Sequence, residues 1–351
     1  MSIPLQVTPA FPPDIGGVGD YAAVLSAKFD EAGDAMATLV SCPGAREAHR
    51  TNHVTFLPQP DAEALARAIE RYDRVLLHFS GYGYARRGLC RWLVDGLSRW
   101  KARSHGRRLV TMFHEVYATG PIWRSSFWTS SAQKRIARDL AILSDAGFVS
   151  SQGGRDQLTQ LAPDLPLELL PVFSNVGEPK APKTLSKRSG QAVVFGGPTR
   201  RDRVYKALGR AVGAVADCFG QAGVTEIIDI GPEMDVPKQV AGCPVTALGP
   251  RPAEEVTAKL SDARIGLVDY PGHVFTKSGI AAAYFAHRLV VLNTSPVSGF
   301  PFDLKDGEQF LRLESFVRCP EKTQAIADGG YAWYLQHDVN ATFEKIRARL
   351  K

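Results

Sequence analysis

The amino-acid sequence predicts an α/β protein with two parallel sheets, each in its own domain. Apolar segments of strand length alternate with segments of helical periodicity along nearly the whole chain. Several of the apolar segments are continuous, which is typical of parallel strands buried on both faces. A polar stretch rich in proline and lysine interrupts the alternation near the middle of the chain, after which it begins again.

The first half of the chain is predicted to form one open sheet. Its strands are expected at residues 3–7, 37–41, 75–79, 109–113, 147–150 and 167–170, and its helices at residues 21–32, 62–72, 88–104 and 132–144. Strands that alternate with helices in this way form βαβ units, in which the strands are parallel. This half, residues 1–176, is the first predicted domain.

The second half repeats this organisation after a predicted linker, GEPKAPKTLSKRSG, at residues 177–190. Strands are expected at residues 192–195, 226–230, 245–248, 265–268 and 289–292, and helices at residues 205–222, 252–261 and 278–286. Residues 191–330 are therefore the second predicted domain. No strand follows the last predicted helix, in residues 331–351, and we expect it to pack back on the first domain.

Composition narrows the class of protein. The 351 residues are 44% apolar and 22% charged, which suits a soluble protein of two domains, and no apolar run is long enough to span a membrane. With no signal-peptide pattern, the expected location is the cytoplasm. The five cysteines are scattered, so neither a disulfide framework nor a zinc site is expected. The net charge of +6 favours anionic partners such as nucleotides, and without a nucleic-acid-binding motif we expect no nucleic acid partner.

A glycine-rich loop, PPDIGGVGDY at residues 12–21, follows the first predicted strand and leads into a helix. Gly16 and Gly17 would let a ligand approach the backbone closely, and the first N–H groups of the helix would attract an anion or a hydroxyl. A tight turn that packs the strand on the helix is the alternative. The loop is not G-x-G-x-x-G, so it gives only weak support for a dinucleotide site.

Two segments of the second half carry basic residues at the start of helices. In FGGPTRRDRVYKAL, residues 195–208, a glycine turn precedes Arg200, Arg201 and Lys206, whose cationic groups suit phosphate oxygens. In residues 248–293, a loop places Lys277 and Ser278 at the start of an alanine-rich helix, between two apolar strands. The alternative for the first of these segments is a solvated, charged turn.

The three segments together resemble those of GT-B glycosyltransferases, nearest to the nucleotide-sugar-dependent hexosyltransferases of glycosyltransferase family 4. P-x-x-G-G-V-G-x-Y matches the N-terminal glycine loop of that family, and FGG…R…K matches its phosphate-binding turn. Residues 248–293 match its donor-binding region, and the resemblance covers essentially the whole chain. Where the family has paired glutamates, this chain has Val274 and Ala282, and His287 and Leu289 replace a usual glycine and proline. These departures leave open the stereochemical outcome and the way in which the ribose is held.

The resemblance implies a GT-B fold, with two Rossmann-like domains facing a central cleft. The first domain would bind the acceptor and the second a nucleoside diphosphate sugar, which is a co-substrate, with no metal and no cofactor. Cationic side chains and helix N-termini would stabilise the leaving diphosphate. The donor site is expected to comprise Gly16, Gly17, Arg200, Arg201, Lys206, His273, Lys277 and Ser278.

Candidate catalytic and acceptor residues lie at predicted strand ends in the first half. His114 could be the base for the acceptor hydroxyl or could orient the sugar together with Glu115, and the family often has a histidine at this position. Asp20 is the alternative base if the reaction inverts. His78 and Trp123 are expected on the acceptor side, since His78 ends a strand and Trp123 lies in the aromatic loop PIWRSSFW. Packing or turn roles are the alternatives for His114, His78 and Trp123.

The predicted helix at residues 88–104 has an apolar stripe surrounded by arginines. The stripe either faces the core or docks on an anionic membrane surface, which would place the protein at the inner membrane face and favour a lipid-linked acceptor.

The predicted function is transfer of a hexosyl unit from a nucleoside diphosphate sugar to a glycan, a lipid-linked acceptor or a small molecule. Two alternatives stay open: a nucleotide-sugar epimerase-like GT-B enzyme, and a non-catalytic GT-B module that binds a nucleotide or glycan.

Overall fold

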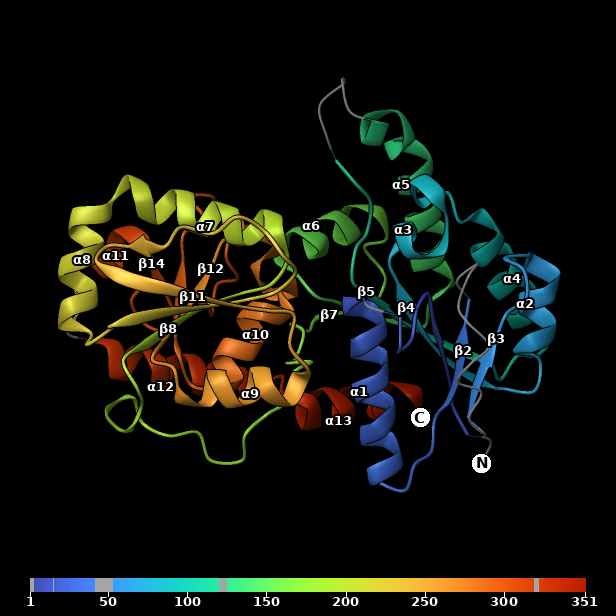
Figure 1. Cartoon of the computed structure of the whole chain (residues 1–351). Helices are drawn as coiled ribbons and strands as arrows, with labels where there is room; N and C mark the ends of the chain where they lie inside the picture. Colours follow the sequence, from blue (N-terminus) through green and yellow to red (C-terminus); the bar gives the residue numbers. More distant parts are fainter. Residues whose placement is uncertain (1–2, 15, 42–52, 120–124, 319–321) are drawn as a thin grey trace. The chain divides into compact units, whose positions relative to one another are not determined.

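The computed structural model describes the chain apart from residues 1–2, 15, 42–52, 120–124 and 319–321 (Figure 1). The chain divides into two compact units. The first unit comprises Met1–Pro171 together with Val339–Lys351, and the second unit comprises Val172–Asp338. Each unit contains a seven-stranded sheet with helices in the connections between strands.

The sheet of the first unit is parallel throughout. Its strands are β1 (Leu5–Thr8), β2 (Ala37–Val40), β3 (Val54–Phe56), β4 (Arg74–Phe79), β5 (Arg108–Phe113), β6 (Ala146–Val149) and β7 (Leu167–Leu169), in the spatial order β3-β2-β1-β4-β5-β6-β7. The chain runs outward from β1 in one direction and then from β4 in the other. The boundary between β1 and β4 is therefore a topological switch point, where open α/β sheets bind ligands beyond the carboxyl ends of their strands.

The helices of the first unit agree with the predicted order but not with every predicted boundary. They are α1 (Gly17–Glu31), α2 (Ala62–Ala68), α3 (Gly81–Tyr84), η2 (Arg86–Gly88), α4 (Arg91–Ala102), α5 (Ser125–Leu143), α6 (Gln152–Leu161) and α13 (Val339–Leu350). The sequence analysis missed β3 and α6. Strand β3 has only three residues, and α6 is largely polar with two glycines in its first turn, so neither has a clear apolar period.

The apolar stripe predicted at residues 88–104 faces the core of the first unit. In α4, Leu93, Leu97 and Trp100 are completely buried, and the indole of Trp100 donates a hydrogen bond of 2.9 Å to the Tyr72 carbonyl. The surrounding cations are paired with acidic residues of the same unit, including Arg91 with Asp95 and Asp139, Arg103 with Glu63 and Glu70, and Lys101 with Asp145. The core-facing interpretation is therefore the one that the structure supports, and the buried stripe offers no apolar face to a membrane.

The sheet of the second unit is also doubly wound. Its strands are β8 (Gln191–Phe195), β9 (Glu226–Ile230), β10 (Gln239–Val240), β11 (Cys243–Gly249), β12 (Ile265–Val268), β13 (Val290–Asn293) and β14 (Leu311–Arg312), in the order β10-β11-β9-β8-β12-β13-β14. All neighbours are parallel except β10 and β11. The switch point of this sheet lies between β8 and β12.

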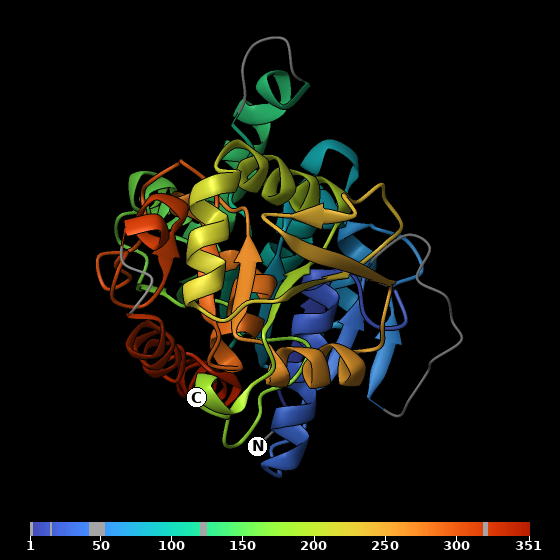
Figure 2. The ribbon, with the colours of Figure 1, turned by 60° about the vertical axis from the view of Figure 1, so that its left-hand side comes forward.

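Helices cover both faces of this second sheet. They are η3 (Leu185–Lys187), α7 (Pro198–Arg210), α8 (Val212–Gln221), α9 (Ala253–Asp262), η4 (Gly272–Lys277), α10 (Gly279–Ala286), α11 (Leu313–Arg318) and α12 (Thr323–Tyr334). Figures 1 and 2 show α7 and α8 on one face, and Figure 1 labels α9, α10 and α12 on the other. The single helix predicted at residues 205–222 is two helices, because the backbone at Ala211 leaves the helical region, and the first begins earlier, with Pro198 in its first turn.

The division between the units differs from the predicted linker. The boundary lies at Pro171 and Val172, and the polar segment at residues 177–190 belongs to the second unit. Leu185 is buried there, and the Arg188 guanidinium donates to the carbonyls of Lys183, Ala263 and His287. A segment with few apolar residues can still be anchored by one buried arginine that donates to three backbone carbonyls.

The predicted helix at residues 331–350 is also two helices. Its first part is the end of α12, which belongs to the second unit, and its second part is α13, which packs on the first unit. The Phe343 ring of α13 lies 4.7 Å from the Phe29 ring of α1, and Arg347 forms an ion pair of 2.5 Å with Asp34. The chain thus returns to its first unit at its end.

Candidate functional site

The glycine loop of the first unit lies between β1 and α1. Gly16 is the N-cap of α1 and provides no side-chain cap. A methyl group at Gly19 would lie 3.0 Å from the Ala10 carbonyl carbon and oxygen, so close packing of the loop on the helix requires Gly19. A methyl group at Gly16 or Gly17 would meet no described atom within 4 Å, and neither glycine has a φ in the left-handed region that favours glycine. The fold itself therefore requires glycine at Gly19 but not at Gly16 or Gly17.

A buried polar network lies at the carboxyl end of the first sheet, next to its switch point. It joins Gln6 of β1, His78 of β4 and His114, which directly follows β5. The His78 Nε2 atom lies 2.9 Å from Gln6 Oε1, and His78 Nδ1 lies 3.3 Å from His114 Nε2. Gln6 and His78 are completely buried, whereas 8% of His114 is exposed.

The network keeps His78 uncharged. Burial, followed by the charge of His114, lowers the pKa of His78 well below its usual range. The Tyr21 ring of α1 packs edge-on against both imidazoles, with centroids 5.7 Å from His78 and 4.9 Å from His114. Burial raises the pKa of Tyr21, so the phenol also stays neutral. His78, which was predicted on the acceptor side, is completely buried, and its imidazole nitrogens contact Gln6 and His114.

The remaining predicted residues of the first unit have varied positions. Glu115 is exposed and accepts a hydrogen bond of 3.1 Å from the Ser80 hydroxyl. Asp20 is half-buried in the first turn of α1, and its N–H donates to the Gly16 carbonyl. Trp123 lies outside the described residues.

The second unit gathers polar side chains at its own switch point, beyond the carboxyl ends of β8 and β12. The Arg200 guanidinium of α7 lies 4.2 Å from the centroid of the Tyr270 ring and donates to the Asp269 carbonyl at 3.2 Å. The Asp269 carboxylate lies 3.6 Å from Arg200 and 3.8 Å from Arg203. On the next strand, Asn293 holds the Tyr270 backbone with two hydrogen bonds, of 3.0 and 2.8 Å. Two cations thus lie at the edge of the sheet, beside a fixed aromatic ring.

The start of α7 adds to the cationic character of this edge. Its N-cap, Gly197, gives no side-chain hydrogen bond, and a methyl group there would meet no described atom within 4 Å. The preceding glycine, Gly196, has φ +128° and packs against Ile280, so it is required by the turn itself. A helix N-terminus with an open backbone and arginines in its first turns is suited to an anion.

Arg201 and Lys206 were predicted in the donor site together with Arg200, but their side chains do not lie at this edge. Arg201 is only 2% exposed, and its guanidinium donates to the Asp229 carboxylate and the Pro232 carbonyl. The Tyr205 hydroxyl donates a hydrogen bond of 2.7 Å to the same carboxylate. Lys206 is two turns into α7 and forms an exposed ion pair of 2.7 Å with Asp202. The arginines with access to this edge are Arg200 and Arg203.

The other predicted donor residues lie before α10. His273 is exposed in η4, and Lys277 ends that turn. Ser278 is buried and caps α10 by accepting a hydrogen bond from the Ala281 N–H at 3.2 Å. Ser278 is therefore a helix cap, which explains its position without a ligand.

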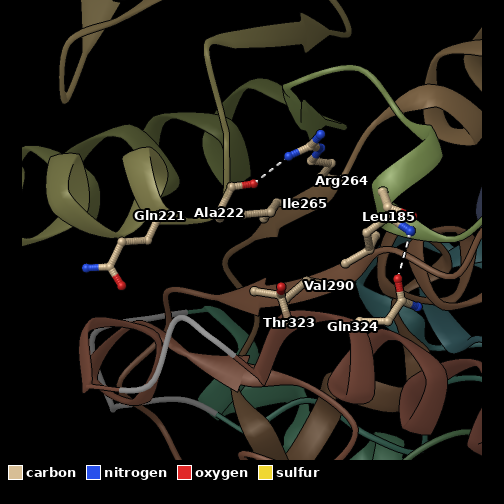
Figure 3. Close-up of a pocket in the computed structure, with 9 residues that line it drawn as sticks. Leu185, Gln221, Ala222, Arg264, Ile265, Val290, Thr323 and Gln324 are labelled. Atoms are coloured by element: carbon tan, nitrogen blue, oxygen red, sulfur yellow. Dashed lines mark hydrogen bonds between the residues drawn. The ribbon is translucent and has the colours of Figure 1, made fainter.

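A cavity of about 330 Å³ lies at the opposite edge of the second sheet (Figure 3). It is bounded by Ile265 and Val290, the first residues of β12 and β13, so it lies at the amino ends of the strands. Two of its polar side chains are engaged within the fold: Arg264 donates to the Ala222 carbonyl at 2.9 Å, and Gln324 accepts from the Leu185 N–H at 2.8 Å. These contacts join the connecting segments, and the cavity is separate from the candidate site.

No three His, Cys, Asp or Glu side chains in the described part of the chain are arranged to hold a metal ion. None of the described helices is long and apolar enough to cross a bilayer.

The sequence analysis missed several residues that build these sites. Gln6 lies inside β1, Asp269 and Tyr270 directly follow β12, and Asn293 ends β13, and none of them forms part of a motif. The available signal was position, since a polar residue at the carboxyl end of a predicted parallel strand lies where ligands bind.

Comparison with solved structures identifies the fold. The chain is similar to α,α-trehalose 6-phosphate synthase from Burkholderia multivorans, with a TM-score of 0.63 and 12% identity over 100% of this chain and 96% of that chain. It is similar to the glycosyltransferase WaaG, involved in lipopolysaccharide biosynthesis, with a TM-score of 0.60 and 13% identity over 99% and 100% of the two chains. It is also similar to an α-glucosyltransferase solved with UDP-glucose and DNA, with a TM-score of 0.61 and 11% identity over 99% of each chain.

These similarities extend over both units, so the chain has the GT-B fold of two Rossmann-like domains, which the sequence predicted. No family description matches the sequence. No curated protein matches it either.

Proposed function

We propose that the chain is a glycosyltransferase that moves a hexosyl unit from a nucleoside diphosphate sugar to an acceptor. The observation that carries the proposal is the switch point of the second sheet, where Arg200 and Arg203 lie beside the open N-terminus of α7. Two guanidinium groups and the positive end of the helix dipole match the charge of a diphosphate. The solved structures of the same fold include one bound to UDP and one bound to UDP-glucose, which supports a nucleotide donor.

In this proposal the second unit holds the donor. Arg200 and Arg203 contact the diphosphate, Lys277 is a further cation for it, and the Tyr270 ring offers a flat surface to the base or the sugar. Diphosphate departure is stabilised by these cations and by the helix N-terminus, so the reaction needs no metal. Gly16 and Gly17 of the first unit give the donor close access to the backbone.

The first unit supplies the chemistry at the acceptor. His114 is at a strand end, slightly exposed and supported by a buried network, and it takes the proton of the acceptor hydroxyl. Glu115 orients the acceptor, and Asp20 is the second candidate base. We propose a glycan, a lipid-linked sugar or a small molecule as the acceptor. No described feature favours the epimerase-like or non-catalytic alternatives.

The test begins with a titration of the purified chain with a panel of nucleoside diphosphates and their sugars. One nucleotide should raise the melting temperature by mass action, and Arg200→Ala should reduce that shift at the same nucleotide concentration. Lys206→Ala is the matched control, because Lys206 is a cation of the same helix paired away from the strand edge.

Transfer is then measured with the stabilising donor and a panel of acceptors. The panel includes DNA, because one similar structure contains it, although no nucleic acid partner is expected. Lys277→Ala should lower turnover strongly. The free energy of unfolding of the variant should stay close to that of the unaltered chain. If no nucleotide shifts the melting temperature, the donor site is wrong and the proposal fails.

A further inference from the structure

The buried network beneath His114 determines which of its ring nitrogens carries the proton. The starting point is the orientation of the Gln6 amide. Its Nε2 atom lies 3.1 Å from the Ala22 carbonyl oxygen and 2.8 Å from Thr38 Oγ1. A carbonyl oxygen only accepts hydrogen bonds, so the nitrogen of the amide must face Ala22, and the Gln6 oxygen must face His78.

The tautomer of His78 follows from this orientation. The Gln6 oxygen accepts a hydrogen bond, so His78 Nε2, at 2.9 Å, must carry a proton. Because burial keeps His78 neutral, its other nitrogen, Nδ1, has no proton and can only accept. The neighbour of that atom, at 3.3 Å, is His114 Nε2. His114 must therefore donate from Nε2.

We propose that Gln6 and His78 are positioning residues that hold His114 in the tautomer protonated at Nε2, so that Nδ1 is its basic atom in glycosyl transfer. The inference deepens the proposed function and rests on it for the role of His114. When Nδ1 takes the proton of the acceptor hydroxyl, the oxygen keeps the electron pair with which it attacks the sugar carbon. The bond from that carbon to the diphosphate oxygen breaks, and the diphosphate leaves with its electron pair.

The network also accommodates the imidazolium that His114 becomes when Nδ1 takes the proton. Once Nδ1 has taken a proton, Nε2–H of His114 still donates to His78 Nδ1, so this hydrogen bond is kept. The Gln6 oxygen carries no proton, so a proton cannot be relayed from His78 beyond this atom. Gln6 and His78 therefore orient the base and carry no proton away from it.

The test is the protonation pattern of the His114 ring in the full chain. Two-bond nitrogen–proton NMR spectra of protein with ¹⁵N-labelled histidine, recorded at alkaline pH, distinguish protonated from unprotonated ring nitrogens. The signals that disappear in His114→Gln belong to His114. We expect a protonated Nε2 and an unprotonated Nδ1 in the unaltered chain.

Four variants separate positioning from packing. Gln6→Leu and His78→Leu remove acceptors in the network, and the His114 signals should shift toward the other tautomer. His78→Asn restores an acceptor where His78 Nδ1 was, and it should return the pattern of the unaltered chain. Thr38→Val is the matched control, because it removes a buried hydrogen bond of Gln6 while the Gln6 oxygen still faces His78.

The inference is overturned if His114 is protonated at Nδ1 in the unaltered chain, or if both leucine variants keep its pattern. Should the leucine variants not fold, the spectra of the unaltered chain, Thr38→Val and His78→Asn still decide the question. Transfer assays are a separate readout. If the tautomer is as expected but no donor supports transfer, the proposed function fails and the positioning of His114 stands.

Discussion

At the scale of single residues, two adjacent arginines of α7 have opposite surroundings. Arg201 is buried and paired with Asp229, which also accepts from Tyr205, whereas Arg200 lies at the strand edge over Tyr270. Sequence reasoning assigned both to phosphate because they are adjacent and chemically identical. In a helix, neighbouring residues point about 100° apart, so one can face the sheet while the next faces its edge.

This contrast predicts different outcomes for the two alanine substitutions. Arg201→Ala should lower the free energy of unfolding by about 3–5 kcal/mol, because it leaves the Asp229 carboxylate buried without its guanidinium partner. Arg200→Ala should change it by less than about 1 kcal/mol, since its ion pair is partly exposed. The affinity of the Arg200→Ala variant for a nucleoside diphosphate should fall roughly tenfold to a hundredfold, because a charge-assisted hydrogen bond is lost. Urea unfolding and nucleotide titration of both variants measure this, and equal losses of stability would contradict it.

A second residue-scale prediction concerns His287, which is completely buried. Burial, and then the charge of Arg188, lowers its pKa from 6.5 to about 4. The unfolded chain therefore binds a proton below about pH 6.5 that the folded chain does not bind until about pH 4. The free energy of unfolding should fall as the pH drops through this window, by about 3 kcal/mol for this group.

The comparison variant is His287→Asn, whose side-chain amide can still donate to the Ala283 carbonyl, which His287 Nδ1 contacts at 2.7 Å. Urea unfolding between pH 4 and pH 7 should show a shallower pH dependence for the variant than for the unaltered chain. If the free energy of unfolding depends on pH identically in the two proteins, His287 is protonated to the same extent in the folded and unfolded chain. His78 shifts in the same direction, so some dependence should persist in the variant.

At the scale of elements, the glycine loop and α1 show how one motif has two purposes. Gly19 lets the helix approach the Ala10 backbone, while Gly16 and Gly17 have open space around them. The close contact explains one glycine by packing alone. In the proposed function, the other two are the residues whose backbone the donor approaches.

We therefore predict opposite effects of alanine at Gly19 and Gly17. Gly19→Ala should destabilise the first unit by about 1–3 kcal/mol, because the new methyl group is forced against the Ala10 carbonyl. Gly17→Ala should leave stability unchanged or raise it by up to about 1 kcal/mol, since alanine favours the helix. If donor binding uses this loop, Gly17→Ala should also raise the KM for the nucleotide sugar. Thermal unfolding and steady-state assays of both variants test the pair, and a stable Gly19→Ala variant would contradict the packing argument.

At the scale of the whole molecule, the last helix belongs to the first unit although it follows the second in the chain. Phe343 of α13 packs on Phe29, and Lys345 forms an ion pair of 3.0 Å with Glu168. The two units are therefore not simply consecutive halves of the sequence. The stability of the first unit depends on residues that follow the second unit in the chain.

Phe343→Ala should consequently destabilise the first unit and leave the second unit as it is. The expected loss is about 3–5 kcal/mol, as for other buried phenylalanines, because Phe343 is only 3% exposed. Glu344→Ala is the matched control on the same helix, since 64% of that side chain is exposed, and it should change stability by less than about 0.5 kcal/mol. Hydrogen exchange of amides in β4 and β9 reports on the two units separately. Equal loss of protection in both strands would contradict the assignment of α13 to the first unit.

Much of the fold could be predicted because it depends on local signals. Continuous apolar runs indicated the long central strands, such as β4 and β5, and glycine or proline marked the starts of α1 and α7. The missed strand and helix have little local signal, since β3 is too short and α6 is polar. Such elements form because their neighbours in the fold provide partners for them. The break at Ala211 does have one, because Gly209 and Gly213 flank it, and the single predicted helix ran through both glycines.

The sequence alone determined the class of the protein: two doubly wound α/β units of the GT-B fold, with a glycine loop at the first strand and arginines at a helix start in the second half. Only the tertiary structure decided what each polar residue does. It buried Arg201 beside Asp229, left Arg200 at the strand edge, and joined Gln6, His78 and His114 from three strands. Periodicity and turn chemistry act between near neighbours, so a sequence displays them directly. Burial and hydrogen-bond partners depend on residues that are distant along the chain, and only the folded arrangement brings them together.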